Sequence, residues 1–500
     1  MENLNSYVVI LYFSVLCLLA VFGANRYYLV YQYLKHKKNP HRPKARFDEL
    51  PYVTIQLPMY NEMYVAERLI DAVVKMDYPA DRLEIQVLDD STDETVSIAS
   101  RRVDMYREQG IDISYIHRDN RKGFKAGALA EGMRIARGEF IAVFDADFVP
   151  NRNFLHNTIH YFTDDQIGMV QLRWSHLNRN YSLMTQLQSI FLDGHFVIEH
   201  TARNRTGCFF NFNGTAGIWR KVAIADGGGW EHDTLTEDLD LSYRTQMKGW
   251  KFVYLPELAV PAELPVDVIA FKAQQHRWAK GSIQTCKKLL PRIMHANLPF
   301  KVKREAFVHL AANFAYLLMI PLSIAILPVM ILRRNLNWGQ MMALDVPLFL
   351  MATVSFAVFY IVSQKELYAN WTQTLKYLPM LMALGIGLSV NNSVAVVEAV
   401  LNQESEFVRT PKFGIEDKGD KWVGKKYRGN KKMLIPAIEL VLAVYFSFAV
   451  VISIAEGIWL TMPFLLMFQF GYSYMSYQSF SIMIKKRLVL KRASANAFSH

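Results

Sequence analysis

Two aspartates in the segment FDADFVP are suited to binding a cation. Asp145 and Asp147 stand two positions apart, directly after the apolar run 139–144. At the end of a strand both carboxylates can face one cavity if the backbone turns there. Carboxylate oxygens are hard donors that select Mg²⁺ or Mn²⁺. An aspartate-rich turn without a ligand is the alternative, so this pair needs support from other segments.

Two further segments carry groups that could act on a phosphorylated ligand. The segment NRKGFKAGAL places Lys122 and Lys125 just before a helix, where they could meet phosphates or simply be solvated. The segment LTEDLDL places Glu237 and Asp238 in an otherwise apolar stretch that opens a helix. Either these carboxylates cap the helix, or one of them is a general base that accepts a proton from an attacking hydroxyl.

The segment QQHRWAKG combines three side-chain types that suit a phosphorylated sugar. Gln274 supplies an amide, Arg277 a guanidinium that can bind phosphate through two hydrogen bonds, and Trp278 a ring that can stack on a sugar face. The alternative is the membrane-surface face of an amphipathic helix. That alternative does not explain all three side chains, so the segment favours a ligand site.

Alternating strands and helices are expected to position these groups. The runs 52–57, 84–89 and 139–144 read as strands, and the helix-compatible stretches are 62–76, 94–109 and 124–137. This alternation predicts a parallel, doubly wound α/β sheet, in which ligands bind beyond the carboxyl ends of the strands. We expect the polar residues that follow the strands to form one acidic rim: Tyr60, Asn61, Glu62, Asp89, Asp90, Asp93, Asp145 and Asp147.

The composition indicates membrane spans joined to a sizeable soluble domain. The chain has 500 residues, of which 52% are hydrophobic, 13% aromatic and 20% charged. This abundance of apolar residues excludes a disordered or collagen-like chain. The cysteines, Cys17, Cys208 and Cys286, are too few and too scattered for a disulfide framework or a cysteine-built zinc site. The soluble domain is therefore expected in a reducing compartment.

Six apolar stretches and three basic segments predict how the chain meets a membrane. The apolar stretches are 7–34, 306–332, 345–363, 375–400, 434–455 and 459–483. Positive segments stay on the cytoplasmic side, and all three do so if 375–400 lies at the interface and the other five stretches cross. The basic segments, 35–46, 412–432 and 485–492, carry more than the whole net charge of +11. The remaining body is mildly acidic, which argues against nucleic acid as a partner.

The ordered segments PMYNE, VLDDSTD, KAGAL, DAD, FNGTAGIWR, TED and QQHRW together resemble the membrane-bound family 2 glycosyltransferases of the cellulose synthase superfamily. Their spelling is most similar to the cellulose synthase-like mannan and glucan synthases, the glucomannan 4-beta-mannosyltransferase type. The resemblance covers about 50–290 and extends to FVRTPKFG at 407–414. It implies a Rossmann-like cytosolic domain of the GT-A type, inserted between transmembrane helices.

The resemblance also implies roles for individual residues. Residues matching the nucleotide-sugar site are Tyr60, Asn61, Glu62, Asp90, Lys125, Asp145, Gln274 and Arg277. Asp145 and Asp147 match the ligands of Mg²⁺ or Mn²⁺. Asp238 matches the catalytic base, with Glu237 and Arg277 beside it. Residues matching the acceptor site are Phe210, Asn213, Gly214, Thr215 and Trp278. Thr410 and Lys412 match a mobile gating loop, although this chain has RTPK where cellulose synthases usually have VTxK.

The implied protein is an inverting glycosyltransferase that extends a β-linked, β-1,4 glucan or mannan processively and moves it across its membrane. Its partners would be a nucleotide-sugar donor of the UDP-glucose or GDP-mannose class, the growing glycan, and lipids of a bacterial or Golgi-type membrane. The alternative is transfer of one sugar to a lipid such as diacylglycerol. The expected organisation begins with a first membrane helix and basic linker at 1–46, a cytosolic catalytic domain at 47–270 and the QQHRW helix region at 271–300. A membrane helix pair follows at 301–365, then the interfacial and gating region at 366–432, a second helix pair at 433–484 and a basic tail at 485–500.

Overall fold

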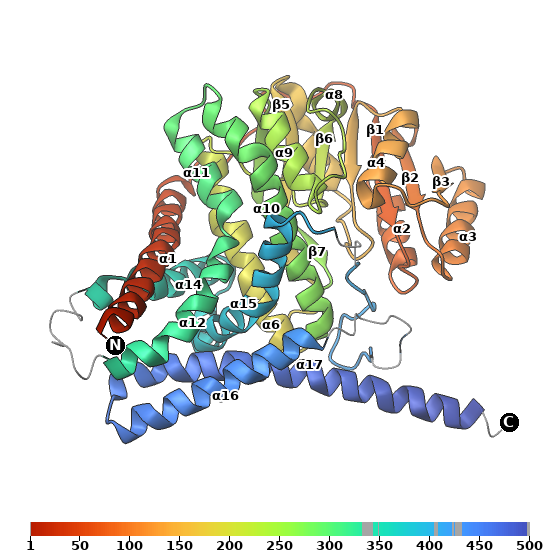
Figure 1. The fold of residues 1–500 in the computed structure, drawn as a ribbon. Helices are drawn as coiled ribbons and strands as arrows, with labels where there is room; N and C mark the ends of the chain where they lie inside the picture. The colour runs from red at the N-terminus through yellow and green to blue at the C-terminus, as the bar shows by residue number, and fades with distance from the viewer. Residues whose placement is uncertain are drawn as a thin grey trace.

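A seven-stranded mixed sheet forms the centre of the soluble part (Figure 1). The computed structural model describes residues 2–332, 344–348, 350–404, 409–422, 425 and 433–497, so most of the basic segment 412–432 beyond 422 lies outside the described residues. The strands, in the order β3-β2-β1-β4-β6-β5-β7, are β1 (Val53–Met59), β2 (Leu83–Asp89), β3 (Ile113–His117), β4 (Phe140–Val143), β5 (Ile167–His176), β6 (Gly217–Arg220) and β7 (Lys251–Ala262).

The three strands expected from the sequence are neighbours and run parallel. β1 pairs in parallel with β2 on one side and with β4 on the other. Every residue of β1, β2 and β4 is buried, which is typical of strands covered on both faces by helices. Helices of this domain are α2 (Ala66–Val74), α3 (Thr95–Glu108), α4 (Phe124–Ile135), α5 (Phe154–Thr158), α8 (Lys221–Asp226) and α9 (Glu237–Met247).

The predicted parallel arrangement is confirmed for β1, β2 and β4, but the sheet as a whole is mixed, because β6 pairs antiparallel with both β4 and β5. The chain between β5 and β6 forms α6 (Leu183–Gly194), the π turn η3 (His195–His200) and α7 (Thr201–Arg205). Gln171 in the middle of β5 lies opposite Gly217 at the start of β6. The connecting segment therefore returns to the edge of the sheet that it left, and β6 must run backwards.

Long helices lie beside this domain, and five of them are apolar and long enough to cross a membrane: Ser6–His36, Phe314–Leu332, Leu344–Leu367, Trp371–Val400 and Leu434–Ala455. The helices of this part are α1 (Glu2–His36), α10 (Val268–His295), α11 (Phe300–Ala311), α12 (Phe314–Leu332), α14 (Ser355–Leu367), α15 (Leu378–Val400), α16 (Leu434–Ala455) and α17 (Met462–Ala497). In Figure 1, α16 and α17 run side by side at the opposite end from the sheet.

Two of these helices bear on the predicted membrane topology. The stretch 375–400 falls in α15, which packs against α10, α12 and α17, and most of its apolar window is buried inside the protein. The stretch 459–483 falls mostly in α17, which packs on α16 but is not among the five helices that are apolar enough to cross. The number of crossings stays a prediction.

Candidate functional site

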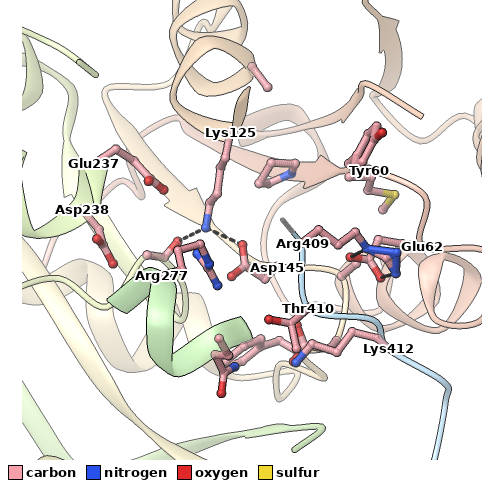
Figure 2. Close-up of a pocket in the computed structure, with 18 of the residues that line it drawn as sticks. Tyr60, Glu62, Lys125, Asp145, Glu237, Asp238, Arg277, Arg409, Thr410 and Lys412 are labelled. Carbon is pink, nitrogen blue, oxygen red and sulfur yellow. Dashed lines mark hydrogen bonds and ion pairs between the residues drawn. The ribbon is translucent and has the colours of Figure 1, made fainter. Parts of the chain in front are cut away.

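One cavity opens beyond the carboxyl ends of β1 and β4 (Figure 2). Its walls come from the strand ends, the start of α4, the loop before β6, the start of α9, α10 and the segment 409–412. The predicted site residues that line it are Tyr60, Glu62, Asp90, Lys125, Asp145, Asp147, Asn213, Gly214, Glu237, Asp238, Gln274, Arg277, Trp278, Thr410 and Lys412. Residues from eight segments of the sequence thus meet in one place.

Several predicted residues do not line the cavity. Asn61 lies just behind it, where its side chain accepts a hydrogen bond from the Thr92 amide at 2.8 Å. Phe210 is buried in the core under the sheet. Thr215 is also buried, and its hydroxyl accepts a hydrogen bond from the Asp145 amide at 2.9 Å. Lys122 is absent from the lining as well. Thr215 therefore holds the backbone of Asp145 from within the core.

The expected acidic rim is only partly formed. Asp90 lines the cavity and pairs with Arg118 through two short contacts of 2.7 and 2.5 Å. Asp89 instead accepts a hydrogen bond from Tyr115 Oη at 2.6 Å and is fully buried. Asp93 accepts from the Thr95 amide at the start of α3 at 2.9 Å. The expectation was wrong for Asp89 and Asp93, because local backbone and ring donors use their oxygens.

The two aspartates of FDADFVP are each paired with a lysine. Lys125 Nζ donates to Asp145 Oδ1 at 2.5 Å, and Lys412 Nζ donates to Asp147 Oδ2 at 2.6 Å. The carboxyl group of Glu62 is close enough to interact with the charges of Asp145 and Asp147. Burial raises the pKa of Glu62 to about 8; Arg409 lowers this pKa, and the charge of Asp147 raises it further. Carboxylate oxygens concentrated at one wall of the cavity are the donor set that a hard divalent cation requires.

A second acidic cluster is already paired with an ammonium group. Glu231, Asp233 and Asp240 lie close enough together to hold a metal ion. Lys288 Nζ, however, sits among them, at 2.5 Å from Glu231, 2.8 Å from Asp233 and 3.0 Å from Asp240. The ammonium group already supplies the positive charge, so this cluster is an ion-pair network that ties α10 to the start of α9.

Glu237 and Asp238 begin α9 and face the cavity together. Burial and the neighbouring Glu237 raise the pKa of Asp238 to about 7, and Lys125 acts against them. One Asp238 oxygen accepts a hydrogen bond from the Leu239 amide at 2.8 Å, which fixes the carboxyl at the helix start. A carboxyl with this pKa can accept a proton near neutral pH, as a general base must.

Lys125 joins the carboxylates of the site to the loop before β6. Besides Asp145, its ammonium donates to the Gly214 carbonyl at 2.8 Å (Figure 2). Gly214 has φ +80°, and a Cβ atom there would lie 3.1 Å from Asp238 Oδ2 and 3.2 Å from Lys125 Nζ. Glycine is therefore needed both for the backbone conformation and for the close approach to Asp238.

Helix α10 carries Gln274, Arg277 and Trp278 to the cavity. Its register is set against the start of α9, where Gln284 Oε1 accepts a hydrogen bond from the Leu235 amide at 2.9 Å. Gly281 permits this approach, because a Cβ atom there would lie 2.5 Å from the Thr236 side chain. The segments LTEDLDL and QQHRWAKG, which stand apart in the sequence, are thus in direct contact.

The segment 409–414 closes one side of the cavity. Lys412 also donates to the Glu263 carbonyl at 3.0 Å, and the Glu263 carboxylate accepts from the amides of Phe413 and Gly414, each at 2.9 Å. Arg409 pairs with Glu62 at 3.0 Å and also donates to the Asn61 carbonyl. The segment is therefore bound in the cavity through four polar groups.

Sequence reasoning missed three residues of this site. The Arg121 guanidinium lies 3.3 Å from the centre of the Tyr60 ring, with a left-handed backbone at φ 41°. Arg409 and Glu263 hold the segment 409–414 as described. Arg409 stands next to Thr410, and Arg121 stands in the basic segment NRKG, so both had a local signal. Glu263 had none, because it lies in an apolar stretch after β7.

Comparisons with known proteins agree with this geometry. Residues 51–281 match the family described as "Glycosyltransferase like family 2". The chain is 40% identical over 313 residues to "Glucomannan 4-beta-mannosyltransferase 1" of Oryza sativa subsp. japonica, covering 59% of either chain. It is 38% identical over 322 residues to "Glucomannan 4-beta-mannosyltransferase 1" of Cyamopsis tetragonoloba, covering 61% of either chain. The chain thus spans about three fifths of the length of these relatives.

A solved structure shares the fold over most of the chain. "Mannosyltransferase PcManGT from Pyrobaculum calidifontis in complex with GDP-Man and Mn2+" superimposes with a TM-score of 0.54 and 19% identity, covering 79% of this chain and 100% of that one. The mixed sheet with a ligand cavity at its carboxyl edge is accordingly of the GT-A type.

Proposed function

Because residues 51–281 form a glycosyltransferase family 2 domain, we propose that this protein is an inverting, metal-dependent hexosyltransferase that extends a β-linked mannan or glucan. The observation that carries the proposal is the meeting of Asp238, Asp145, Asp147 and Arg277 in one cavity. The donor would be a nucleotide sugar of the GDP-mannose or UDP-glucose class. The names of the relatives favour mannose and a β-1,4 linkage.

The roles of the residues follow from their places. The acceptor hydroxyl attacks the anomeric carbon as its proton passes to Asp238, and the bond from that carbon to the diphosphate oxygen breaks. A single displacement of this kind inverts the anomeric centre. Arg277 and Lys125 stabilise the negative charge that develops on the leaving nucleoside diphosphate. A divalent cation held by Asp145 and Asp147 would supply further stabilisation of that charge.

The position of α10 supports a polymer as the product. Trp278 lines the cavity on the side of α10, which packs against α15 and α17 in the helical part. An aromatic ring at this place can stack on the terminal sugar of an acceptor. A glycan that grew at Trp278 would lie next to the apolar helices, so we propose processive extension and passage through the membrane with the catalytic domain cytosolic.

Replacement of the proposed base tests the reaction. We expect Asp238→Asn to bind the donor with unchanged affinity and to lose transfer by a factor of about 10² to 10⁴, the usual contribution of a general base. Transfer of radiolabelled sugar from each candidate donor and calorimetric donor binding measure the two effects. Unchanged polymer synthesis in Asp238→Asn would remove this residue from the mechanism.

The chemical nature of the product tests the acceptor. A labelled product that is insoluble in alcohol and digestible by a β-mannanase or β-glucanase supports polymer extension. A labelled product that extracts into organic solvent means transfer of one sugar to a lipid such as diacylglycerol, and it would overturn the processive proposal. Linkage analysis of the digestible product identifies the sugar and the bond formed.

A further inference from the structure

His195 and His200, which belong to none of the sequence motifs, contact the loop that faces Asp238. His195 and His200 bound the π turn η3, between α6 and α7. A π turn widens a helix by one residue, and such turns are frequent at functional sites. His195 Nε2 lies 3.1 Å from Asn213 Nδ2, and His200 Nε2 lies 2.5 Å from Asn213 Oδ1. The side-chain amide of Asn213 is thus held between both rings.

The hydrogen-bond chain continues away from the cavity to buried charges. His195 Nδ1 lies 2.9 Å from Glu199 Oε2, and Arg203 Nη1 donates to the same oxygen at 3.1 Å. Arg203 Nε donates to Glu305 at 2.9 Å, and both of these side chains are buried. Burial alone would raise the pKa of Glu199, but Arg203 and the hydrogen bond from His195 lower it well below its ordinary value. Glu199 is therefore an ionised acceptor.

With both histidine rings neutral, the ionised Glu199 fixes the direction of the bonds in this chain. His195 must donate from Nδ1 to Glu199, so its Nε2 accepts from the Asn213 amide group. Asn213 then presents its carbonyl oxygen to His200, which must donate from Nε2. Burial lowers the pKa of His200 well below its usual value, so that ring stays neutral. In this protonation state the Asn213 amide has one orientation that satisfies both rings.

The backbone at Asn213 is fixed from the other side. Its amide N–H donates to Gln171 Oε1 at 3.0 Å, and Gln171 is fully buried in β5. The next residue is Gly214, whose carbonyl accepts from Lys125 and whose Cα faces Asp238. The path from Glu199 through His195 and Asn213 therefore ends at the proposed base.

We infer that His195 and His200 are positioning residues, which hold the loop 211–216 through Asn213 so that an acceptor hydroxyl is aligned with Asp238. This inference rests on the proposed function for the alignment, although the hold on the loop stands by itself. The two bonds to the histidines use one N–H and one lone pair of the Asn213 amide. The role of Asn213 is accordingly to place Gly214.

Paired substitutions test the role of His200. Glutamine can donate from its amide nitrogen where His200 donates from Nε2, whereas leucine cannot donate. We expect His200→Leu to lower transfer to an acceptor oligosaccharide by roughly ten- to hundredfold, the effect of a small misplacement in a reacting pair. Donor affinity should stay unchanged, and the fraction of donor hydrolysed to free sugar should rise. His200→Gln should recover most of the transfer.

Hydrogen exchange separates this inference from the proposed function. In the full-length protein, amide exchange of residues 211–216 should rise in His200→Leu and in His195→Leu, and not in His200→Gln. His309→Asn is the matched control, because His309 Nδ1 lies 2.7 Å from Tyr243 Oη and makes no hydrogen bond to Asn213 in the part of the chain that the structure describes. Its exchange over 211–216 should equal that of the wild type.

Two outcomes would overturn the inference. One is exchange over 211–216 that is unchanged in both leucine variants. The other is loss of donor binding and transfer in equal measure with no rescue by His200→Gln, which would give the histidines a purely structural role. If the wild type transfers no hexose from any donor, the proposed function fails, while the exchange data still decide whether the histidines hold the loop.

Discussion

The proton affinity of Asp238 is set by its surroundings. Burial and Glu237 raise its pKa to about 7, and Lys125 limits the rise. Without a lysine at this position two adjacent carboxyls in a buried site would hold their protons more tightly still. The arrangement leaves Asp238 ionised in a useful fraction at neutral pH, and this fraction can be changed by changing its neighbour.

We expect kcat/KM for transfer to fall on the acidic side of pH 7, because only ionised Asp238 can accept the proton. At pH 6 about one tenth of a group with this pKa is ionised, so the rate should be about tenfold below its plateau. Glu237→Gln removes the like charge, which lowers the pKa of Asp238 and moves the acidic limb to lower pH. A pH–rate profile of each protein measures the shift.

Glu231→Gln is the control for that profile, since Glu231 pairs with Lys288 and does not line the cavity. Its acidic limb should coincide with that of the wild type. An acidic limb in Glu237→Gln that does not move, or that moves to higher pH, would show that Glu237 does not raise the proton affinity of the base.

Single residues were predictable where the functional side chains stand close together in a short segment. The carboxylates of DAD and TED stand in apolar surroundings that make them conspicuous, and both lie at the cavity. Arg409 was missed because its place in the site depends on its hydrogen bond to Glu62, which stands 347 positions earlier in the sequence. Asp89 was overestimated because its partner, Tyr115, lies on a strand that the sequence did not reveal. Contacts of this kind exist only after folding.

Among the elements, the strands that form the catalytic edge were predictable and the others were not. β1, β2 and β4 are short β-branched runs bounded by turn residues, which is the usual signal of a buried strand. β6 has only four residues, which lie at the end of the segment FNGTAGIWR. A run this short gives no clear strand pattern in the sequence. The reversed direction of β6 depends on the path of α6 and α7, which no local pattern encodes.

The segment 409–422 competes with a cation for Asp147. Lys412 Nζ lies 2.6 Å from Asp147 Oδ2, so its ammonium occupies an oxygen that a metal ion would use. We expect Lys412→Met to raise the affinity of the donor-free protein for Mn²⁺ by about tenfold, the weight of one charge-assisted hydrogen bond. Electron paramagnetic resonance of free Mn²⁺ during a titration measures this affinity.

Lys418→Met is the matched control, because Lys418 is an exposed residue of the same segment. It removes one positive charge from the protein and should leave Mn²⁺ affinity unchanged. Equal affinities in Lys412→Met and the wild type would mean that the contact between Lys412 and Asp147 does not oppose the cation.

A buried ion pair anchors α10 to the helical part. Lys272 stands two positions before Gln274, and its ammonium donates to Glu439 of α16 at 2.7 Å and to Ser479 of α17 at 2.8 Å. Both side chains of the pair are buried. The helix that carries Trp278 is therefore fixed to two helices distant in sequence.

Breaking this pair from one side should destabilise the protein. Lys272→Met leaves Glu439 buried without its counter-charge, a change that usually costs about 3–5 kcal/mol. The double variant Lys272→Met with Glu439→Leu removes both charges and should recover most of the loss. Unfolding in detergent, followed by heat or denaturant, measures the difference. The exposed pair Arg134 and Glu131 is the control, where removal of either partner should cost about 0–1 kcal/mol. Equal stability of the single variant and the wild type would contradict a role for the pair.

At the scale of the whole molecule, a region that matches glycosyltransferase family 2 is combined with five helices that are long and apolar enough to cross a membrane. The order of charges along the chain, rather than the helices themselves, predicts which side each segment occupies. The basic segments 35–46 and 412–432 lie on one side only if the stretch 375–400 does not cross. α15, which contains most of that stretch, packs among α10, α12 and α17, and this packing is compatible with either path.

Two cysteine substitutions on either side of α16 decide between these paths. With the catalytic domain in the cytosol, as proposed, Lys418 is cytoplasmic and Glu456, which follows α16, is on the outer side if 375–400 does not cross. If 375–400 crosses, both sides are reversed. Both residues are exposed. In a variant lacking Cys17, Cys208 and Cys286, we expect an impermeant maleimide to label Glu456→Cys in intact cells and Lys418→Cys only after permeabilisation. Glu108→Cys, on α3 of the catalytic domain, is the cytosolic control and should behave like Lys418→Cys. Labelling of Lys418→Cys from outside, with protection of Glu456→Cys, would show that 375–400 crosses and that the excess of positive charge does not determine the orientation.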